Sequence, residues 1–220
     1  MINGKVNIHE PAEGSVWVAV ENRDGRYLSS RGTMLFLRIV QPITLTTARL
    51  LLRMFQPEDL NAFAAMNADE AVMRHYPAPL DRNQSQKFMD SIMDHWEQNG
   101  FGLFATTDRS SGELLGYTGL KVPQFEAFFT PCVEIGWRFK KESWGNGYAT
   151  EAAAACLDFG FFKIGLKQIV SFTTAQNQKS EQVMIRLGMK RIGEFENPRV
   201  PPDHPLRPHI LYAIDRPSME

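Results

Sequence analysis

The sequence has few cysteines, no excess of either charge and no long apolar run. Its two cysteines, Cys132 and Cys156, give no disulfide framework and no metal-ligand spacing. With 24 basic and 25 acidic residues, the net charge of −1 offers nucleic acid or an anionic membrane little attraction as a main partner. No apolar segment is as long as a membrane span, and no signal-peptide core is present near the N-terminus. These absences predict a reduced, cytoplasmic protein that acts on neither nucleic acid nor a membrane.

Histidine is also scarce, and its placement does not indicate a metal site. His204 and His209 lie close together, but no cysteine or carboxylate at matching spacing completes a ligand set around them. We therefore expect no metal, and a structural role is the simpler interpretation of each histidine.

The apolar content is sufficient for a folded core, at 43% with 11% aromatic residues. Residues 1–43 differ from the rest of the chain. Asp24-Gly25 lies between two β-prone stretches and predicts a hairpin over 16–28, and a loosely attached extension is the alternative. Residues 44–220 are expected to form the main domain.

Residues 44–214 alternate between strand and helix patterns. Helices are predicted over 57–67 and 83–100, from the glycine-rich turn to about Lys163, and over 180–188; strands are predicted over 48–55, 101–107, 114–122, 132–139, 168–174 and 209–214. This order predicts an α/β (α+β) fold whose sheet is largely antiparallel and turns parallel where helices intervene.

The segment ESWGNGYATEA, residues 142–152, places weak helix formers at the start of a predicted helix. The first N–H groups of a helix have no intrahelical partner, and the helix dipole adds positive charge there. Gly145 and Gly147 remove side chains, so a phosphate can approach these amides, and Thr150 can add a hydroxyl. The segment is neither a Walker loop nor a dinucleotide fingerprint, and a plain turn before a helix is the alternative.

Two linked segments resemble the GNAT superfamily of N-acetyltransferases, particularly the branch with the ribosomal-protein N-terminal acetyltransferases. WGNGYATEA (144–152) is similar to that branch's acetyl-CoA signature, with Trp144 in the usual Gln/Arg place. Downstream, NQKSEQVMIRLGMKRIGEF (177–195) resembles the family's Asn-x-x-Ser…Leu-Gly-Phe segment, with Met189 in place of phenylalanine. The resemblance covers roughly residues 44–214.

The resemblance implies a twisted sheet with splayed central strands, flanked by helices, that binds acetyl-CoA as co-substrate. The acetyl group would pass directly, within a ternary complex, to a primary amine of a peptide N-terminus or an amino-acid-like molecule. The residues that this assigns to the cofactor are Phe139, Trp144, Gly145, Asn146, Gly147, Tyr148, Ala149, Thr150, Asn177 and Ser180. For Ser180, capping of the following helix is a second interpretation.

Acetyl transfer requires a neutral amine, so a base is expected near the thioester. Glu134 is the preferred choice, acting through a water, and the alternatives are that it faces solvent or pairs with Arg138. His209 is a further candidate for base or substrate contact, or it makes a structural hydrogen bond.

The proton donor for the departing thiolate is not assigned by the sequence. Many family members have a tyrosine seven residues after the asparagine, where this chain has Met184, which cannot donate a proton. Tyr148, Ser180 and water are the remaining candidates.

Three questions stay open at this point. The chain could be an acyl-CoA-binding regulatory module without turnover, or it could acetylate polyamine or antibiotic amines. Phe125, Phe128 and Phe129 form either an apolar wall over the acceptor or core packing under a loop. A homodimer is neither indicated nor excluded.

Overall fold

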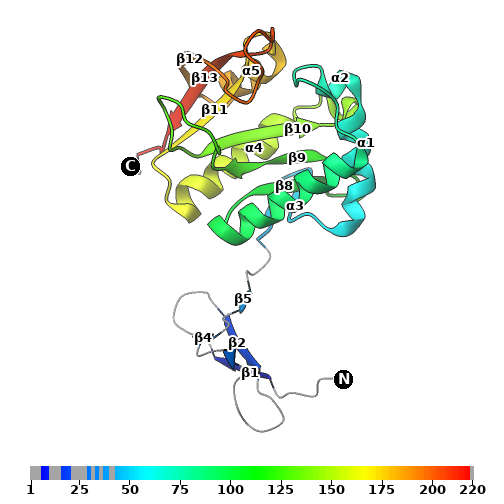
Figure 1. Cartoon of the computed structure of the whole chain (residues 1–220), viewed down its shortest axis with the longest axis vertical. Helices are drawn as coiled ribbons and strands as arrows, with labels where there is room; N and C mark the ends of the chain where they lie inside the picture. The colour runs from blue at the N-terminus through cyan, green and yellow to red at the C-terminus, as the bar shows by residue number, and fades with distance from the viewer. Residues whose placement is uncertain are drawn as a thin grey trace. The chain divides into compact units, whose positions relative to one another are not determined.

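The computed structural model describes residues 6–9, 16–20, 29–30, 33–34, 37–39 and 43–218. Figure 1 shows two units, Met1–Pro42 and Ile43–Glu220, which we describe one at a time.

The described part of the first unit consists of short β-strands. Among them, β1 (Val6–His9), β2 (Val16–Val20) and β5 (Leu37–Ile39) form an antiparallel sheet in the order β1-β2-β5, and β3 (Ser29–Ser30) pairs with β4 (Thr33–Met34). The turn of the predicted hairpin, at Asp24 and Gly25, lies outside the described residues.

The second unit is built on an eight-stranded sheet in the order β12-β13-β11-β10-β9-β8-β7-β6. Its strands are β6 (Leu45–Thr46), β7 (Leu50–Arg53), β8 (Leu103–Asp108), β9 (Leu114–Lys121), β10 (Glu134–Phe139), β11 (Gln168–Thr174), β12 (Lys190–Glu196) and β13 (Pro208–Asp215). All pairings in this sheet are antiparallel except that of β10 with β11. The predicted mixed, largely antiparallel sheet is thus confirmed, while β6 and β12 are additional to the predicted strands.

Helices cover both faces of this sheet, with α1 and α3 in front and α4 behind in the view of Figure 1. Their bounds are α1 (Leu60–Ala68), preceded by a 3₁₀ turn over Pro57–Asp59, then α2 (Glu70–Met73), α3 (Arg82–Asn99), α4 (Tyr148–Phe159), which continues as a π-helical segment over Gly160–Ile164, and α5 (Gln178–Arg186). Among the described residues, no helix is both long and apolar enough to cross a membrane.

The ends of α3 follow from local side-chain chemistry. Asp81 is the N-cap, and its carboxylate accepts the N–H of Gln84, whose side chain accepts the N–H of Asp81 in return. At the other end Gly100 adopts the left-handed conformation with φ of 72°, which glycine tolerates without a steric penalty. Between these ends Ile92 and Trp96 are buried, four residues apart on the face that meets the sheet.

Candidate active site

The strands β10 and β11 are splayed, as the resemblance implies. They share a single register pair, Glu134 with Val170, and beside it the Ser171 hydroxyl donates to the Ile135 carbonyl at 2.9 Å. Backbone groups alternate in direction along a strand, so the N–H and C=O of Trp137 point toward the same opening as the Ile135 carbonyl. Since Trp137 has no register partner on β11, these groups can bind an extended ligand as an added strand would.

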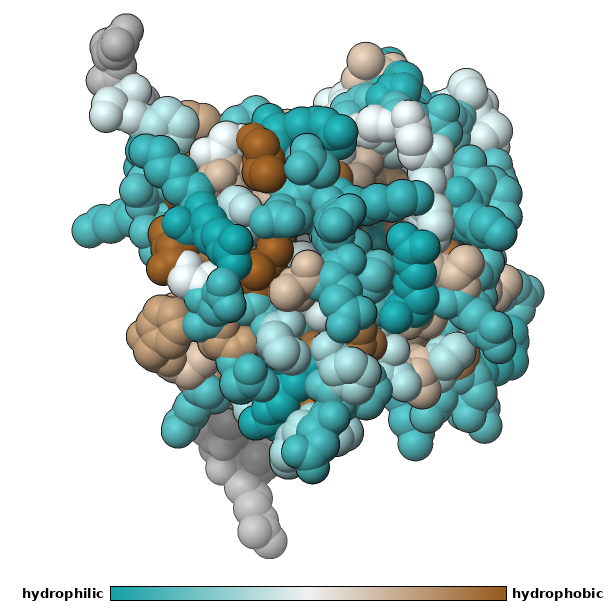
Figure 2. All heavy atoms as spheres, turned by 90° about the horizontal axis from the view of Figure 1, so that it is seen from above, coloured by the Kyte–Doolittle hydropathy of each residue, from teal (hydrophilic) through white to brown (hydrophobic). Residues whose placement is uncertain are grey.

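A cavity of about 790 Å³ extends through this opening. Trp137 and Phe139 project from one face of β10 and Arg138 from the other, and all three line the cavity. The remaining walls come from the first turn of α4 and the turn before it, from α5 and its N-cap, and from α2 with the segment that follows it. In Figure 1, α2 and α5 lie at the same end of the unit. Hydrophilic side chains dominate the face shown in Figure 2, which views the molecule from that end.

The start of α4 presents backbone amides to the cavity. Gly145 and Gly147 have φ of 79° and 78°, in the region that favours glycine, and Gly147 is the N-cap with no side-chain hydrogen bond to the helix. The Ser143 hydroxyl lines the cavity here, is buried, and has no hydrogen-bond partner among the described residues. Free amide donors, a helix dipole and a free hydroxyl fit a phosphate group.

Basic side chains surround this end of the cavity. Arg74, Lys179 and Arg186 line it, whereas no aspartate or glutamate of the described residues does. Lys179 and Arg74 lie over the Trp144 ring at 4.7 and 5.7 Å from its centroid. Three cations without a lining carboxylate favour an anionic ligand such as a diphosphate.

Trp144 also determines which backbone groups of β10 are free to bind a ligand. Its indole N–H donates to the Phe139 carbonyl at 2.9 Å. That carbonyl lies on the strand edge where the sequence predicts pairing with the pantetheine amides. The backbone groups that stay free on this edge of β10 are therefore those of Trp137, two residues before Phe139.

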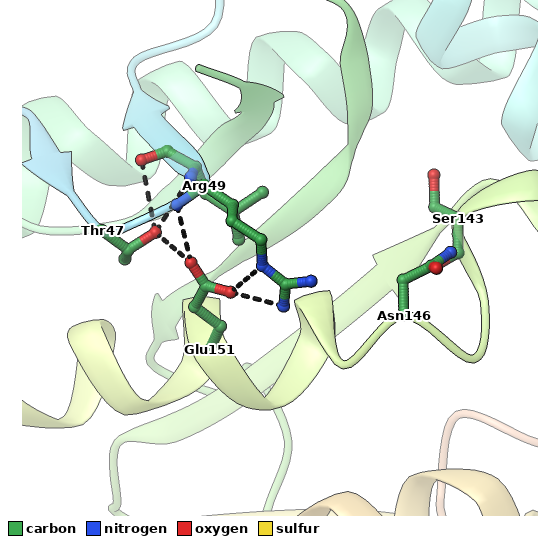
Figure 3. Close-up of polar contacts among 6 residues, drawn as sticks. Thr47, Arg49, Ser143, Asn146 and Glu151 are labelled. Carbon is green, nitrogen blue, oxygen red and sulfur yellow. Dashed lines mark hydrogen bonds and ion pairs between the residues drawn. The ribbon is translucent and has the colours of Figure 1, made fainter. Parts of the chain in front are cut away.

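Glu151 ties the first turn of α4 to the sheet, as Figure 3 shows. Its carboxylate accepts the Thr47 hydroxyl at 2.6 Å and the Arg49 Nε at 2.7 Å, and it forms an ion pair with Arg49. Burial alone would raise the pKa of Glu151, but the hydrogen bonds from Thr47 and Arg49 lower it below its usual value. These contacts give Glu151 a structural role at the helix start.

The start of α5 corrects one expectation. The N-cap is Asn177, not Ser180: the Asn177 side-chain oxygen accepts the Ser180 N–H at 3.3 Å, and the helix begins at Gln178. The Asn177 amide nitrogen donates to the hydroxyls of Ser180 and Thr173 at 3.0 and 3.1 Å. Asn177 and Ser180 both line the cavity. Because the Ser180 hydroxyl accepts the hydrogen bond from Asn177, its own proton stays free to donate.

Met184 lies where many family members have a tyrosine, and its side chain is fully buried in the core. It neither lines the cavity nor donates a proton. Tyr148 does line the cavity, and its ring stacks under the Arg49 guanidinium at 4.6 Å.

Glu134 neither faces solvent nor pairs with Arg138, so both alternatives to a base at this position are wrong. It is 6% exposed, and its Oε2 forms an ion pair with the Lys121 Nζ at 3.3 Å. Burial raises the pKa of Glu134, and the Lys121 and Arg199 cations oppose that rise only in part. A buried carboxylate with a raised pKa is a stronger base than an exposed one.

The segment after α2 contributes Arg74, His75 and Tyr76 to the cavity, and none of these is predicted from the sequence. Its placement follows from Asp69, whose carboxylate accepts the N–H groups of Ala71 and Val72 and caps the short helix. Two sequence signals could have predicted this helix and its following turn: Asp69, two residues before the apolar residues 71–73, and the proline after Tyr76.

His209 lies outside the cavity lining. Its Nδ1 is 3.0 Å from the Arg207 carbonyl and its Nε2 3.1 Å from the Asn197 amide nitrogen, which is the pattern of a neutral ring that donates from Nδ1. Burial lowers its pKa, consistent with a neutral structural histidine. These contacts support the structural alternative for His209, not a role as base or substrate contact.

The loop phenylalanines pack as a cluster. Phe125 and Phe129 meet Phe172 of β11 and Phe195 of β12 at centroid distances of 4.8 to 6.1 Å, with Phe125 stacked on Phe195. Phe128 remains 72% exposed. Phe125 and Phe129 therefore pack under the loop and do not form a wall of the cavity.

The cavity brings together most of the residues assigned to the cofactor: Phe139, Trp144, Gly145, Gly147, Tyr148, Ala149, Thr150, Asn177 and Ser180. Asn146 lies in the same turn, but its side chain turns back to the Ser143 and Trp144 carbonyls at 3.3 and 3.2 Å. Figure 3 shows it beside Ser143 at the start of α4. Glu134 lies outside the cavity lining, on the same strand as the lining residues Trp137 and Arg138 and nearer its N-terminal end.

Comparison with known proteins agrees with this geometry. The model of the acetyltransferase (GNAT) domain family matches residues 49–190. The uncharacterized protein YkkB of Bacillus subtilis is 32% identical over 158 residues, which cover 70% of this chain and 91% of YkkB. The FsC-acetyl coenzyme A-N(2)-transacetylase of Aspergillus fumigatus is 28% identical over 181 residues, 79% of this chain and 76% of that protein.

Among solved structures, the GNAT-family acetyltransferase from Bacillus anthracis superposes with a TM-score of 0.66 at 27% sequence identity. The match covers 79% of this chain and 99% of that one. The residues that the family model matches, 49–190, include every residue that lines the cavity.

Proposed function

This chain belongs to the GNAT acetyltransferase family, and from that premise we propose that it acetylates an α-amine, either of a peptide N-terminus or of an amino-acid-like molecule. Acetyl-CoA is the co-substrate of the family. The curated relative from Aspergillus fumigatus is named as an acetyl coenzyme A-N(2)-transacetylase, which supports nitrogen as the acceptor atom. The finer likeness to the ribosomal-protein branch rests on the WGNGYATEA segment.

The start of α4 is our proposed diphosphate site. The amides from Asn146 to Thr150, the free Ser143 hydroxyl and the cations around Trp144 supply donors and positive charge without a competing lining carboxylate among the described residues. The pantetheine arm would then extend along β10 and donate to the free C=O of Trp137, which leaves the Trp137 N–H for the acyl group. This pairing would place the thioester in the opening between β10 and β11.

Our mechanism assigns few chemical groups to the protein. Acetyl-CoA supplies an activated acyl group, and the chain positions an amine against it. Glu134, through a water, would accept the proton of the ammonium group, and the Trp137 N–H would donate to the developing oxyanion. Tyr148, Ser180 and water remain the candidates for protonating the thiolate.

The observation that carries the acceptor class is the charge of the cavity wall. On the β10 face Arg138 lines the cavity, and among the described residues no carboxylate lines the cavity. A polyamine would bring two or more positive charges against this wall and be repelled. An amine with a single positive charge loses that charge when it is deprotonated for attack, so it avoids most of this repulsion.

The test is release of free CoA thiol from acetyl-CoA in the presence of amino acids, peptides with free N-termini, polyamines and aminoglycosides. We expect turnover on amino acids or peptides. Turnover confined to polyamines or aminoglycosides would contradict the acceptor assignment and leave the acetyltransferase assignment intact. Tight CoA binding without turnover on any amine would indicate a regulatory module.

A further inference from the structure

Arg138 is a buried cation on β10 that the proposed mechanism does not yet use. It is 8% exposed, and it lines the cavity. One terminal nitrogen donates to the Asn67 side-chain oxygen at 2.6 Å, while Nε has no hydrogen-bond partner among the described residues. The guanidinium lies over the Tyr76 ring at 4.1 Å and near the Tyr117 ring at 5.4 Å.

No carboxylate within residues 43–218 forms an ion pair with Arg138. Arginine stays protonated in proteins, so a positive charge is held here by an amide oxygen and aromatic side chains, without a carboxylate among the described residues. Removing a charge from water is costly unless a counter-charge or a full set of hydrogen bonds replaces the water. An anionic ligand in the cavity would supply the missing partner.

The neighbouring positions on the same strand face suggest what that ligand also carries. Glu134, Gly136 and Arg138 alternate onto one face of β10. A Cβ placed on Gly136 would meet only the Glu134 Oε1, at 3.7 Å, so space is open between the acidic and the basic residue. This face therefore has an acidic end, where Glu134 pairs with Lys121, a bare centre and a positive end without a lining carboxylate among the described residues.

We propose that the acceptor is an amine that also carries a carboxylate, and that Arg138 binds this carboxylate while the amine lies over Gly136, toward Glu134. The inference deepens the proposed function and rests on it. Of the acceptors considered, free amino acids and short peptides with an acidic group near the N-terminus have this dipolar form. Polyamines and aminoglycosides lack the carboxylate.

Two other interpretations of Arg138 make different predictions. If its role is structural, between α1 and β9, its replacement should impair every acceptor alike. If it binds a phosphate of the cofactor, its replacement should weaken CoA binding. A role in reading the acceptor carboxylate predicts a loss confined to acceptors that have the carboxylate.

The first experiment uses the unaltered protein and matched acceptors. We would measure kcat/KM for phenylalanine against phenylalaninamide, and for a dipeptide against its C-terminal amide, at saturating acetyl-CoA. Amidation lowers the pKa of the amine and so favours the amide in the absence of recognition. We expect the carboxylate member to be favoured by about 10-fold or more, mainly through KM, as for a lost charge-assisted hydrogen bond.

The second experiment replaces Arg138→Gln and, as a conservative variant, Arg138→Lys. Arg138→Gln should lower kcat/KM for the carboxylate member by about 10- to 100-fold and leave that of the amide nearly unchanged, with Arg138→Lys intermediate. Arg191→Gln, an exposed site on β12 outside the cavity lining, is the matched control and should leave both values unchanged. Should the Arg138 variants fail to fold, the comparison in the unaltered protein still decides.

The outcomes separate this inference from the proposed function. Equal turnover of acids and amides, or preference for the amides, overturns the carboxylate and keeps the acetyltransferase. With no turnover at all, the shift in Tm caused by each acceptor in the presence of CoA decides: stabilisation by the acids alone supports the carboxylate site and contradicts transfer. Absence of both turnover and acid-specific stabilisation overturns both.

Discussion

The two ends of the cavity are built in different ways. At the start of α4 the ligand-facing groups are mainly backbone amides with the Ser143 hydroxyl beside them, and the side chains of Glu151 and Asn146 already have partners within the protein. On the face of β10 that carries Glu134 and Arg138 the polar groups are side chains, and the Arg138 Nε has no hydrogen-bond partner in the described residues.

This difference indicates which end is specific for which ligand. Backbone amides at a helix start bind any phosphate, so they suit a cofactor that is common to a whole family. Buried side chains without partners are costly in the free protein, and a matching ligand recovers that cost. We therefore assign cofactor binding to the α4 end and acceptor choice to the β10 face.

The largest expected effect comes from filling the α4 end with Gly147→Glu. The left-handed φ of 78° disfavours the new side chain, and its charge would repel the diphosphate. We expect CoA affinity, measured by calorimetric titration, to fall by about 1,000-fold.

Gly165→Glu is the matched control for this change. Gly165 also has a positive φ, 84°, a Cβ added there would meet no atom within 4 Å, and the residue lies outside the cavity lining. The control should destabilise the fold to a similar degree and keep CoA binding. Micromolar CoA affinity in Gly147→Glu would contradict the placement of the diphosphate.

The next effect tests the β10 face with Glu134→Gln. Removing the base should lower kcat/KM for the acceptor by about 100-fold, while the CoA affinity stays as it was, because the two ends bind separately. Steady-state kinetics and CoA titration on the same preparation give both numbers. A loss of CoA binding together with the activity would show that the two ends are not separable in this way.

A smaller and more specific effect is expected in the pH profile. Glu134 must be deprotonated to act, so kcat/KM should fall as the pH drops through its raised pKa. Lys121→Met removes a cation that opposes this rise, so the pKa of Glu134 should increase further and the acidic limb of the kcat/KM profile should move to higher pH. Arg199 stays as the remaining cation that acts on Glu134.

Lys190→Met, at an exposed position on β12, serves as the control for the pH profile and should leave the acidic limb in place. An acidic limb that is unchanged in Lys121→Met would argue that Glu134 is not the titrating base.

The smallest effect concerns Glu151→Gln, the same exchange of acid for amide at the other end of the cavity. Its partners Thr47 and Arg49 are partly exposed, so the change should lower the free energy of unfolding by about 1 kcal/mol. Urea denaturation measures this loss, and kcat/KM should change by less than about 3-fold. If Glu151→Gln lost as much activity as Glu134→Gln, the assignment of the base to Glu134 alone would be wrong.

The α4 end was predictable from the sequence because its requirements are local. Two glycines, small residues and a helix start lie within 142–152, and the fold supplies only their surroundings. The start of α5 was misjudged because Asn177 and Ser180 are both good capping residues, and only the backbone path shows that Asn177 caps.

The β10 face could not be predicted to the same degree because distant residues build it. Asn67, which accepts from Arg138, is 71 residues away in the sequence, and Lys121 reaches Glu134 from the neighbouring strand. A sequence pattern shows that Glu134 and Arg138 share a strand face but not that both are buried. Pairing between them was a reasonable expectation that the packing of α1 and β9 overrides.

The most direct test of the whole account follows the acetyl group itself. The protein would be incubated with acetyl-CoA labelled with ¹³C in the acetyl group and an amine acceptor that carries a carboxylate, and the products identified by mass spectrometry. We predict the label in an amide of the acceptor, an equal amount of free CoA, and no label on the protein. Label that accumulates on a protein side chain, or CoA that binds with no transfer, would contradict direct transfer across the opening between β10 and β11.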